Sequence, residues 1–179
     1  MKSSIYNKTQ VFEFIAKYEG CASLTKNIAN PKAKLLHNKN ISNSTILYPY
    51  KCPANIWTIG YGDTLSCKNR AEVDLKKGFY SITYQQAKDN LSDHIINFYC
   101  ELRPFVKVGL NENQWTALLS MAFNFGITKL IKYKVFKAIN DNDVANINKE
   151  WLDWNYKGLG GLKIRREAEL LLFNKPSIH

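Results

Sequence analysis

The sequence predicts an α+β fold in which a small lobe with a β-hairpin precedes a larger all-helical lobe. Three observations support this: a short helical period near the start, strand-like alternation over residues 51–64, and sustained helical periodicity from residue 83 onward. We place the small lobe at about residues 11–80 and the helical lobe at about residues 83–175. Both belong to one predicted domain that spans residues 1–179.

The first expected helix covers QVFEFIAKYEG, residues 10–20, and ends at Gly20. This places Glu19 at the C-terminal end of the helix, where the macrodipole disfavours an anion and favours the protonated form that a general acid needs. The alternative is a surface carboxylate at a frayed helix end. The apolar face of this helix is formed by Val11, Phe14, Ile15 and Tyr18.

Residues 23–47 are rich in Asn, Lys and Ser and show no sustained period, which predicts a long exposed loop that ends in a short strand near residues 44–48. The following segment, KCPANIWTIGYGDT, is typical of a hairpin strand with its turn at CPAN, residues 52–55.

Alternation along that strand places bulky and bare positions on opposite faces. Glycine in a strand often marks a close approach to the backbone, so we expect the face with Thr58 to be open and to border a binding site. The bulky face has Trp57, Ile59 and Tyr61, and the bare face has Thr58, Gly60 and Gly62.

The helical lobe is predicted from its caps. TYQQ (residues 83–86) is a capping box that opens a helix over residues 83–101, a plausible connector between the lobes, and NENQ (residues 111–114) is a weaker box of the same kind. Asp143 can cap a third helix, KGLGG (residues 157–161) is expected to be a loop, and IRREAELLLF forms the last helix. The expected buried faces contain Ala87, Leu91, Ile95 and Phe98, then Trp115, Leu118, Leu119, Ala122 and Phe125, then Val144, Ile147, Trp151 and Trp154.

The chain has 25 Lys and Arg against 15 acidic residues, a formal net charge of +10 that favours an anionic partner. The basic residues are scattered and no recognition motif appears, so we expect no nucleic-acid binding. We find neither a secretory signal nor a run of ~20 apolar residues, and therefore expect a protein made in the cytoplasm without stable membrane insertion.

Four cysteines, Cys21, Cys52, Cys67 and Cys100, stand at irregular spacings without paired CxxC motifs. The three His are not at metal-ligand spacing with them, so we expect no metal site and no cofactor. The default for each cysteine is a reduced, buried thiol, and the redox state stays open.

Four segments together resemble phage-type lysozymes, the endolysins of glycoside hydrolase family 24. They are FEFIAKYEG, YPYKCPANIWTIGYGDT, NQWTALLSMAFNFG and GGLKIRREAE. The resemblance implies a two-lobed lysozyme-like fold with its active site between the lobes, and a monomer that hydrolyses the β-1,4 bond between N-acetylmuramic acid and N-acetylglucosamine in peptidoglycan. It would lyse bacteria from the periplasm after release by a holin or a secretion system.

The resemblance also implies a catalytic triad of Glu19, Cys52 and Thr58. Glu19 would protonate the glycosidic oxygen, while Cys52 and Thr58, with five residues between them, would hold the attacking water. The chain departs from the family pattern in three places: 32 residues separate Glu19 from Cys52, cysteine replaces the commoner aspartate, and Asp63 stands where members often have histidine. Asp63 is therefore an alternative base.

Substrate contacts carried over from the family fall on Thr64, Phe123 and Asn148, although an aromatic residue such as Phe123 at helical spacing is more often part of a core. Arg165 and Arg166 match a paired-arginine motif that we expect to be structural.

Alternatives remain open for both the activity and Cys52. The chain could be a lytic transglycosylase, a chitin-active hydrolase of the same fold, or an inactive peptidoglycan-binding protein. Cys52 could hold water, form a disulfide with Cys21 or Cys67, or serve as a spacer.

Overall fold

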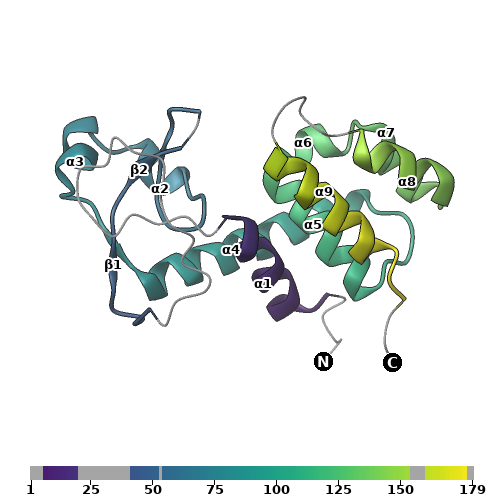
Figure 1. Cartoon of the computed structure of the whole chain (residues 1–179), viewed down its shortest axis with the longest axis horizontal. Coiled ribbons are helices and arrows are strands. Elements are labelled where there is room, and N and C mark those ends of the chain that lie inside the picture. The colour runs from purple at the N-terminus through teal and green to yellow at the C-terminus, as the bar shows by residue number, and fades with distance from the viewer. Residues whose placement is uncertain (1–5, 20–40, 53, 154–159, 177–179) are drawn as a thin grey trace. The chain divides into compact units, whose positions relative to one another are not determined.

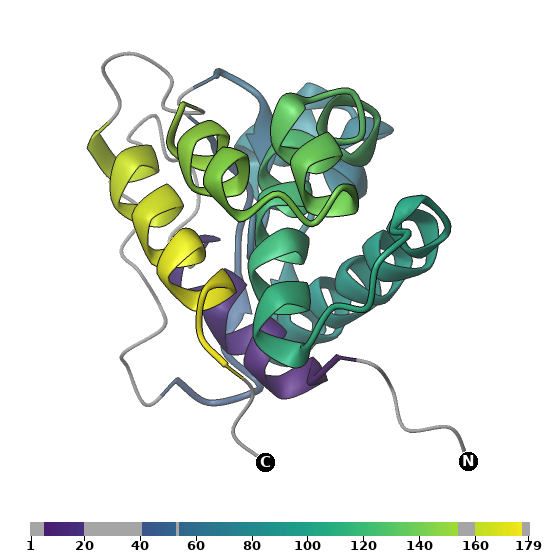
Figure 2. The ribbon, with the colours of Figure 1, turned by 90° about the vertical axis from the view of Figure 1, so that its right-hand side faces the viewer.

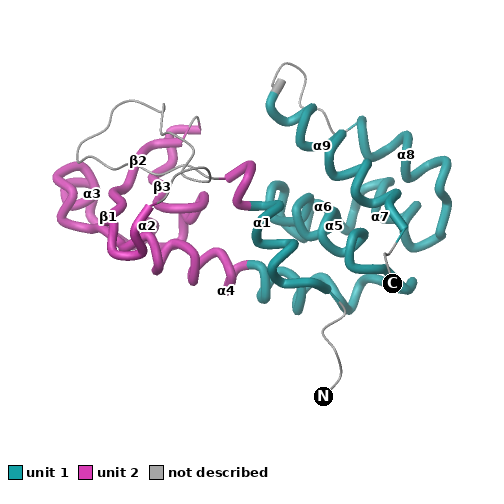
Figure 3. Tube along the Cα trace, turned by 60° about the horizontal axis from the view of Figure 1, so that its bottom comes forward, with its two compact units in different colours: residues 1–15, 95–179 teal, residues 16–94 magenta. Residues whose placement is uncertain are grey.

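The structure is a computed structural model, and it describes residues 6–19, 41–52, 54–153 and 160–176. The chain divides into two compact units (Figures 1 and 3). Unit 1 comprises Met1–Ile15 and Ile95–His179, and unit 2 comprises Ala16–His94. Helices α1 (Lys8–Glu19) and α4 (Tyr84–Leu102) each continue from one unit into the other.

Unit 2 contains all the strands found in the described part of the chain, in two antiparallel pairs. Strand β1 (Ile46–Leu47) pairs with β4 (Ile82–Thr83), and β2 (Tyr50–Lys51) pairs with β3 (Trp57–Thr58). Two short helices, α2 (Leu65–Lys68) and α3 (Glu72–Lys77), follow the second pair. With the helices of unit 1, this confirms the predicted α+β class, although β4, α2 and α3 were not predicted.

The turn between β2 and β3 lies where CPAN predicts it. The backbone N–H of Asn55 donates to the Cys52 carbonyl at 2.8 Å, and the N–H of Cys52 donates to the Ile56 carbonyl at 3.0 Å. Asn55 has φ = 60°, a left-handed conformation that asparagine tolerates better than most residues.

Beyond Thr58 the prediction of a continuing strand is wrong, because residues 59–63 form a tight turn. Ile59 pairs with Asp63, and between them Gly60 and Gly62 have φ values of 56° and 80°. A Cβ on Gly60 would lie 2.9 Å from the Cβ of Ala87 in α4. The glycines therefore provide left-handed backbone and close helix packing, and they do not form a bare strand face.

Ile59 and Tyr61 are buried, as expected for bulky residues, but the predicted exposure of Thr58 and Trp57 is reversed. Thr58 is 2% exposed and Tyr50, its partner across the hairpin, is 5% exposed, whereas Trp57 is only half-buried. Within the two strands, Tyr50 and Thr58 are thus the buried positions, and the more open face contains Trp57.

Both predicted capping boxes are present. At the start of α4, Gln86 N–H donates to Thr83 Oγ1 at 3.1 Å and Thr83 N–H donates to Gln86 Oε1 at 2.8 Å. Asn111 and Gln114 make the same reciprocal pair before α5 (Glu112–Phe125). Local side-chain-to-backbone bonds therefore fix both helix starts.

Unit 1 packs its helices around α5. Helix α9 (Gly160–Phe173) lies along α5 and also against α8 (Val144–Leu152), as Figure 2 shows. In the sequence, the 3₁₀ turn η2 (Arg103–Phe105) precedes α5, and α6 (Ile127–Leu130) and α7 (Lys134–Asn140) come between α5 and α8. The fully buried side chains of the predicted α5 face include Trp115, Leu118, Leu119 and Ala122.

Two details of this unit differ from the prediction. Asp143 caps α8 through the Asn146 N–H, as expected, but Val144 is 60% exposed and lies outside the buried face. Gly160 and Gly161 belong to the first turn of α9 and not to a loop. Residues 20–40, which include most of the predicted loop, and Trp154 lie outside the described residues.

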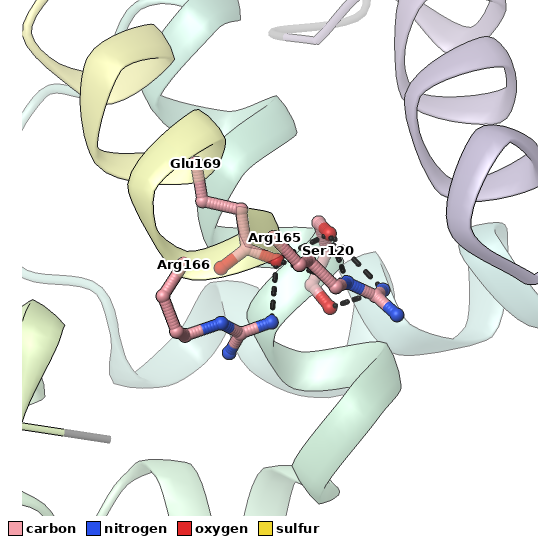
Figure 4. A network of polar contacts seen from close by, with 4 residues as sticks. All are labelled: Ser120, Arg165, Arg166 and Glu169. Atoms are coloured by element: carbon pink, nitrogen blue, oxygen red, sulfur yellow. Dashed lines mark hydrogen bonds and ion pairs between the residues drawn. The ribbon is translucent and has the colours of Figure 1, made fainter. Parts of the chain in front are cut away.

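A buried ionic cluster joins α9 to α5 (Figure 4). Glu169 Oε1 accepts from Arg166 Nη2 at 2.6 Å, from Arg165 Nε at 3.2 Å and from Ser120 Oγ at 2.6 Å. Burial raises the pKa of Glu169, and the two guanidinium groups oppose that rise by favouring the anion. These contacts support the structural role predicted for Arg165 and Arg166.

We expect Glu169→Gln to lower the free energy of unfolding by about 3–5 kcal/mol, because two buried guanidinium groups would lose their shared negative charge. The matched control is Glu167→Gln on the same helix, where an exposed carboxylate lies 3.8 Å from Lys163 and contributes little. Urea denaturation of both variants measures the difference. Equal losses would contradict the structural role of the cluster.

Candidate active site

The three proposed catalytic residues all belong to unit 2. Glu19 is the last residue of α1, as predicted, Cys52 follows β2, and Thr58 ends β3. Gly20, the expected helix stop, lies outside the described residues.

The register of the β2–β3 hairpin places Cys52 and Thr58 on one face. Tyr50 is opposite Thr58 and Lys51 is opposite Trp57, and the backbone bond between Cys52 and Ile56 continues this pairing by one residue. Side chains alternate along a strand, so Cys52 shares the face of Tyr50 and Thr58. Cys52 and Thr58 are then diagonal neighbours across the hairpin, a relation that typically separates residues by ~7–8 Å.

The Thr58 hydroxyl has a fixed orientation, because it donates to the Ile56 carbonyl at 3.0 Å. Its oxygen lone pairs can still accept a hydrogen bond from another molecule.

Cys52 is half-buried and is a free thiol, as are Cys67 and Cys100. The alternative that Cys52 pairs with Cys67 is therefore wrong, and Cys21 lies outside the described residues. The expectation of burial holds for Cys67 but not for Cys100, which is exposed. Burial raises the pKa of the Cys67 thiol to about 11, and the Asp63 charge adds to this effect.

Asp63, the alternative base, is 4% exposed and occupied by donors from two helices. Its carboxylate accepts from the Ser66 backbone N–H at 3.1 Å, from the Ser66 hydroxyl, and from Asn90 Nδ2 at 3.1 Å. These bonds tie the turn after β3 to α2 and α4, which favours a structural role for this carboxylate.

Thr64 lies beside the other face of the hairpin. It lines a pocket of about 530 Å³ together with Lys51, Trp57 and residues of α2 and α3. Neither Cys52 nor Thr58 lines this pocket. The structure thus groups Thr64 with the open face of the hairpin and away from the Thr58 face.

Phe123 and Asn148 belong to unit 1, and each contacts a neighbouring helix. The ring of Phe123 in α5 lies 5.7 Å from that of Phe98 in α4. Asn148 in α8 accepts from Asn174 Nδ2 at 2.8 Å, just beyond α9. Their predicted contacts with substrate stay predictions.

Sequence reasoning missed the pocket residues Lys51, Trp57 and Arg70. The available signal was the alternation along the strand. It placed the Trp57 side chain on the opposite face from Thr58, but the Trp57 face was interpreted as facing the core.

Among residues that the structure describes, no three His, Cys, Asp or Glu side chains form a group that could hold a metal ion. In that same part of the chain, no helix combines the length and apolar character needed to cross a membrane.

Comparison with known proteins gives a consistent family. A family model described as phage lysozyme matches residues 41–169, a segment that includes Cys52 and Thr58 and begins after Glu19. An endolysin of Acyrthosiphon pisum secondary endosymbiont phage 1 is 31% identical over 134 residues, which cover 71% of this chain and 86% of the relative. An endolysin of Bacillus phage PZA is 32% identical over 121 residues, covering 66% of this chain and 44% of the relative.

Among solved structures, the muramidase domain of SpmX from Asticaccaulis excentricus superposes with a TM-score of 0.68 and 24% identity. The match covers 98% of this chain and 100% of that domain. At this identity the likeness shows the lysozyme-like fold.

We expect Asp63→Ala to lower the free energy of unfolding by about 1–3 kcal/mol, because buried donors of Ser66 and Asn90 would lose their acceptor. Asp93→Ala is the control, since this exposed aspartate lies on α4 near Asn90 and its loss removes the same charge. Urea denaturation compares the two. A change no larger than that of the control would contradict the structural role of Asp63.

Proposed function

The chain belongs to the phage lysozyme family, and from this membership we propose that it cleaves the β-1,4 bond between N-acetylmuramic acid and N-acetylglucosamine through Glu19, Cys52 and Thr58. Membership makes the chain a peptidoglycan-hydrolysing glycosidase of bacterial lysis, and the roles of the residues are our proposal. The observation that carries it is the hairpin register, which gives Cys52 and Thr58 a common face.

Glu19 is the general acid in this proposal. It protonates the glycosidic oxygen as the bond to the anomeric carbon breaks, and water supplies the new bond to that carbon. It is the last residue of α1.

Cys52 and Thr58 orient the attacking water. The Thr58 hydroxyl donates to the Ile56 carbonyl, so its oxygen accepts a hydrogen bond from one O–H of the water. The Cys52 sulfur, as a thiolate, accepts a hydrogen bond from the other O–H. It takes up that proton and becomes a thiol as the water oxygen bonds to the anomeric carbon. A thiol is a weaker substitute for the carboxylate found more often at this position in the family.

The substrate is the glycan strand of peptidoglycan, and the site of action is the bacterial cell wall. We propose that a monomer reaches the wall through a holin or a secretion system. The net charge of +10 supports attraction to the anionic polymers of the envelope.

Mass analysis of products from purified peptidoglycan tests the activity. A hydrolase adds water and leaves a reducing N-acetylmuramic acid end. The second candidate is a lytic transglycosylase, which needs no attacking water. It leaves an anhydro end that is lighter by one water. The cysteine at position 52 is the observation that favours this candidate. Anhydro products, or no products at all, would contradict the hydrolase.

Glu19→Gln should reduce the rate of peptidoglycan hydrolysis by ~10²–10⁴-fold, because the amide cannot protonate the leaving oxygen. Glu13→Gln is the matched control, since Glu13 is an exposed residue of the same helix and should keep its activity. Turbidity loss of permeabilised Gram-negative cells measures both rates. More than about a tenth of the wild-type rate in Glu19→Gln would overturn the assignment.

Cys52→Asp should retain or raise the rate, and Cys52→Ala should fall well below wild type, because only the former can accept a proton from water. Alkylation should inhibit the wild-type chain and leave Cys52→Asp active, which separates Cys52 from the other thiols. The raised pKa of Cys67 makes that thiol slow to react. A fully active, stable Cys52→Ala variant would refute the catalytic role.

A further inference from the structure

The pocket on the open face of the hairpin is built from four elements of unit 2. Lys51 comes from β2, Trp57 from β3, Lys68 from α2, and Glu72 from α3, while Arg70 lies between the two helices. These elements surround a volume of about 530 Å³. Because Lys51 and Trp57 alternate with Cys52 and Thr58, the pocket opens on the opposite hairpin face from the proposed catalytic pair.

Three cationic side chains line this pocket, and Arg70 is the most firmly held. Its guanidinium carbon lies 3.7 Å from the centre of the Tyr80 ring, and its Nε donates to the Ser66 carbonyl at 3.2 Å. This arrangement leaves the two terminal nitrogens of a fixed, planar donor group for a carboxylate. The others are Lys51 and Lys68.

One carboxylate faces these cations. Glu72 lies 3.6 Å from Lys51 Nζ and 3.2 Å from Lys76 Nζ. A hydrogen bond and the charge of Lys76, together with the charge of Lys51, hold the pKa of Glu72 below its ordinary value. Glu72 is therefore an anion at neutral pH, and it can pair with an incoming ammonium group.

The remaining lining is apolar. Ile56, Leu75 and the ring of Trp57 contribute it, and Lys51 Nζ lies 5.4 Å from the centre of that ring. The pocket thus combines apolar surface, three cations and one anion.

We propose that this pocket binds the acidic stem peptide of peptidoglycan, the short peptide attached to N-acetylmuramic acid. Such a peptide has several carboxylates, one free ammonium group on its diamino acid, and small apolar side chains. The carboxylates complement Arg70 and Lys68, the ammonium group complements Glu72, and the apolar side chains complement the apolar lining.

Charge decides between this ligand and two others. An uncharged glycan strand would bring no anion to Lys68 and Arg70, the two pocket cations that do not pair with Glu72. A polyphosphate would place its negative charges against Glu72. A ligand with both signs of charge fits the lining better than either.

This inference rests on the proposed function, because it assigns a part of the same substrate. A peptide attached to a sugar on the Thr58 face must pass around the edge of the hairpin. Four extended residues span ~13 Å, which is enough to cross a two-stranded ribbon whose strands lie ~5 Å apart. Peptide binding would then help to select intact peptidoglycan over bare glycan.

Titration with the free tetrapeptide stem, containing a diamino acid, tests the binding directly. We expect tryptophan fluorescence to change on binding to the whole chain, and Lys68→Glu to raise the Kd about tenfold or more, since a charge-assisted contact becomes repulsive. Lys77→Glu, an exposed change of the same charge at the end of α3 and outside the pocket, should leave the Kd unchanged. A peptide whose carboxylates are amidated should not bind.

No binding by the wild-type chain, or equal weakening by Lys68→Glu and Lys77→Glu, would overturn the proposal. The titration needs no catalysis, so it can be repeated with Glu19→Gln and remains decisive even where hydrolysis fails. Rates on intact peptidoglycan and on strands freed of peptide provide a second readout. The ratio of the two rates should fall several-fold in Lys68→Glu and stay constant in Lys77→Glu, and a constant ratio in both would contradict a role of the pocket in selecting substrate.

Discussion

The register of the β2–β3 hairpin is the constraint on which the site depends. A slip of one residue would exchange the two faces, so that Lys51 and Trp57 would take the side of the proposed catalytic pair. Two strands of two residues each are too short to fix this register by themselves. Their ends fix it instead, through the Cys52–Asn55 turn on one side and the Gly60–Gly62 turn on the other.

Neighbouring helices hold the second of these turns in place. Gly60 meets Ala87 of α4 so closely that no side chain fits between them, and Asp63 joins the turn to Ser66 and Asn90 by hydrogen bonds. The aspartate that interrupts the family pattern at this position therefore has a physical explanation in this chain. It holds the hairpin against α2 and α4, close in sequence to the residues that we propose act on the substrate.

The sequence predicted those features that depend on local interactions. The capping boxes at Thr83 and Asn111 were found because each involves residues three positions apart. Short family motifs singled out Glu19, Cys52 and Thr58, whose catalytic roles stay a proposal. The glycines after Thr58 were misinterpreted, because both a strand and a left-handed turn accept them and only the packing of Ala87 decides. The pocket beside Trp57 was missed, because its lining comes from four elements and no spacing of residues in the sequence predicts it.

The central claim is that the hairpin separates two parts of one substrate, with the sugar on the Thr58 face and the peptide on the Trp57 face. A crystal structure of the Glu19→Gln variant with a soluble disaccharide-peptide fragment tests this claim most directly. We predict the sugar ring beside Cys52 and Thr58 and the peptide carboxylates on Arg70 and Lys68. A sugar ring seated on Trp57, or a peptide that makes no contact with the pocket, would contradict the account.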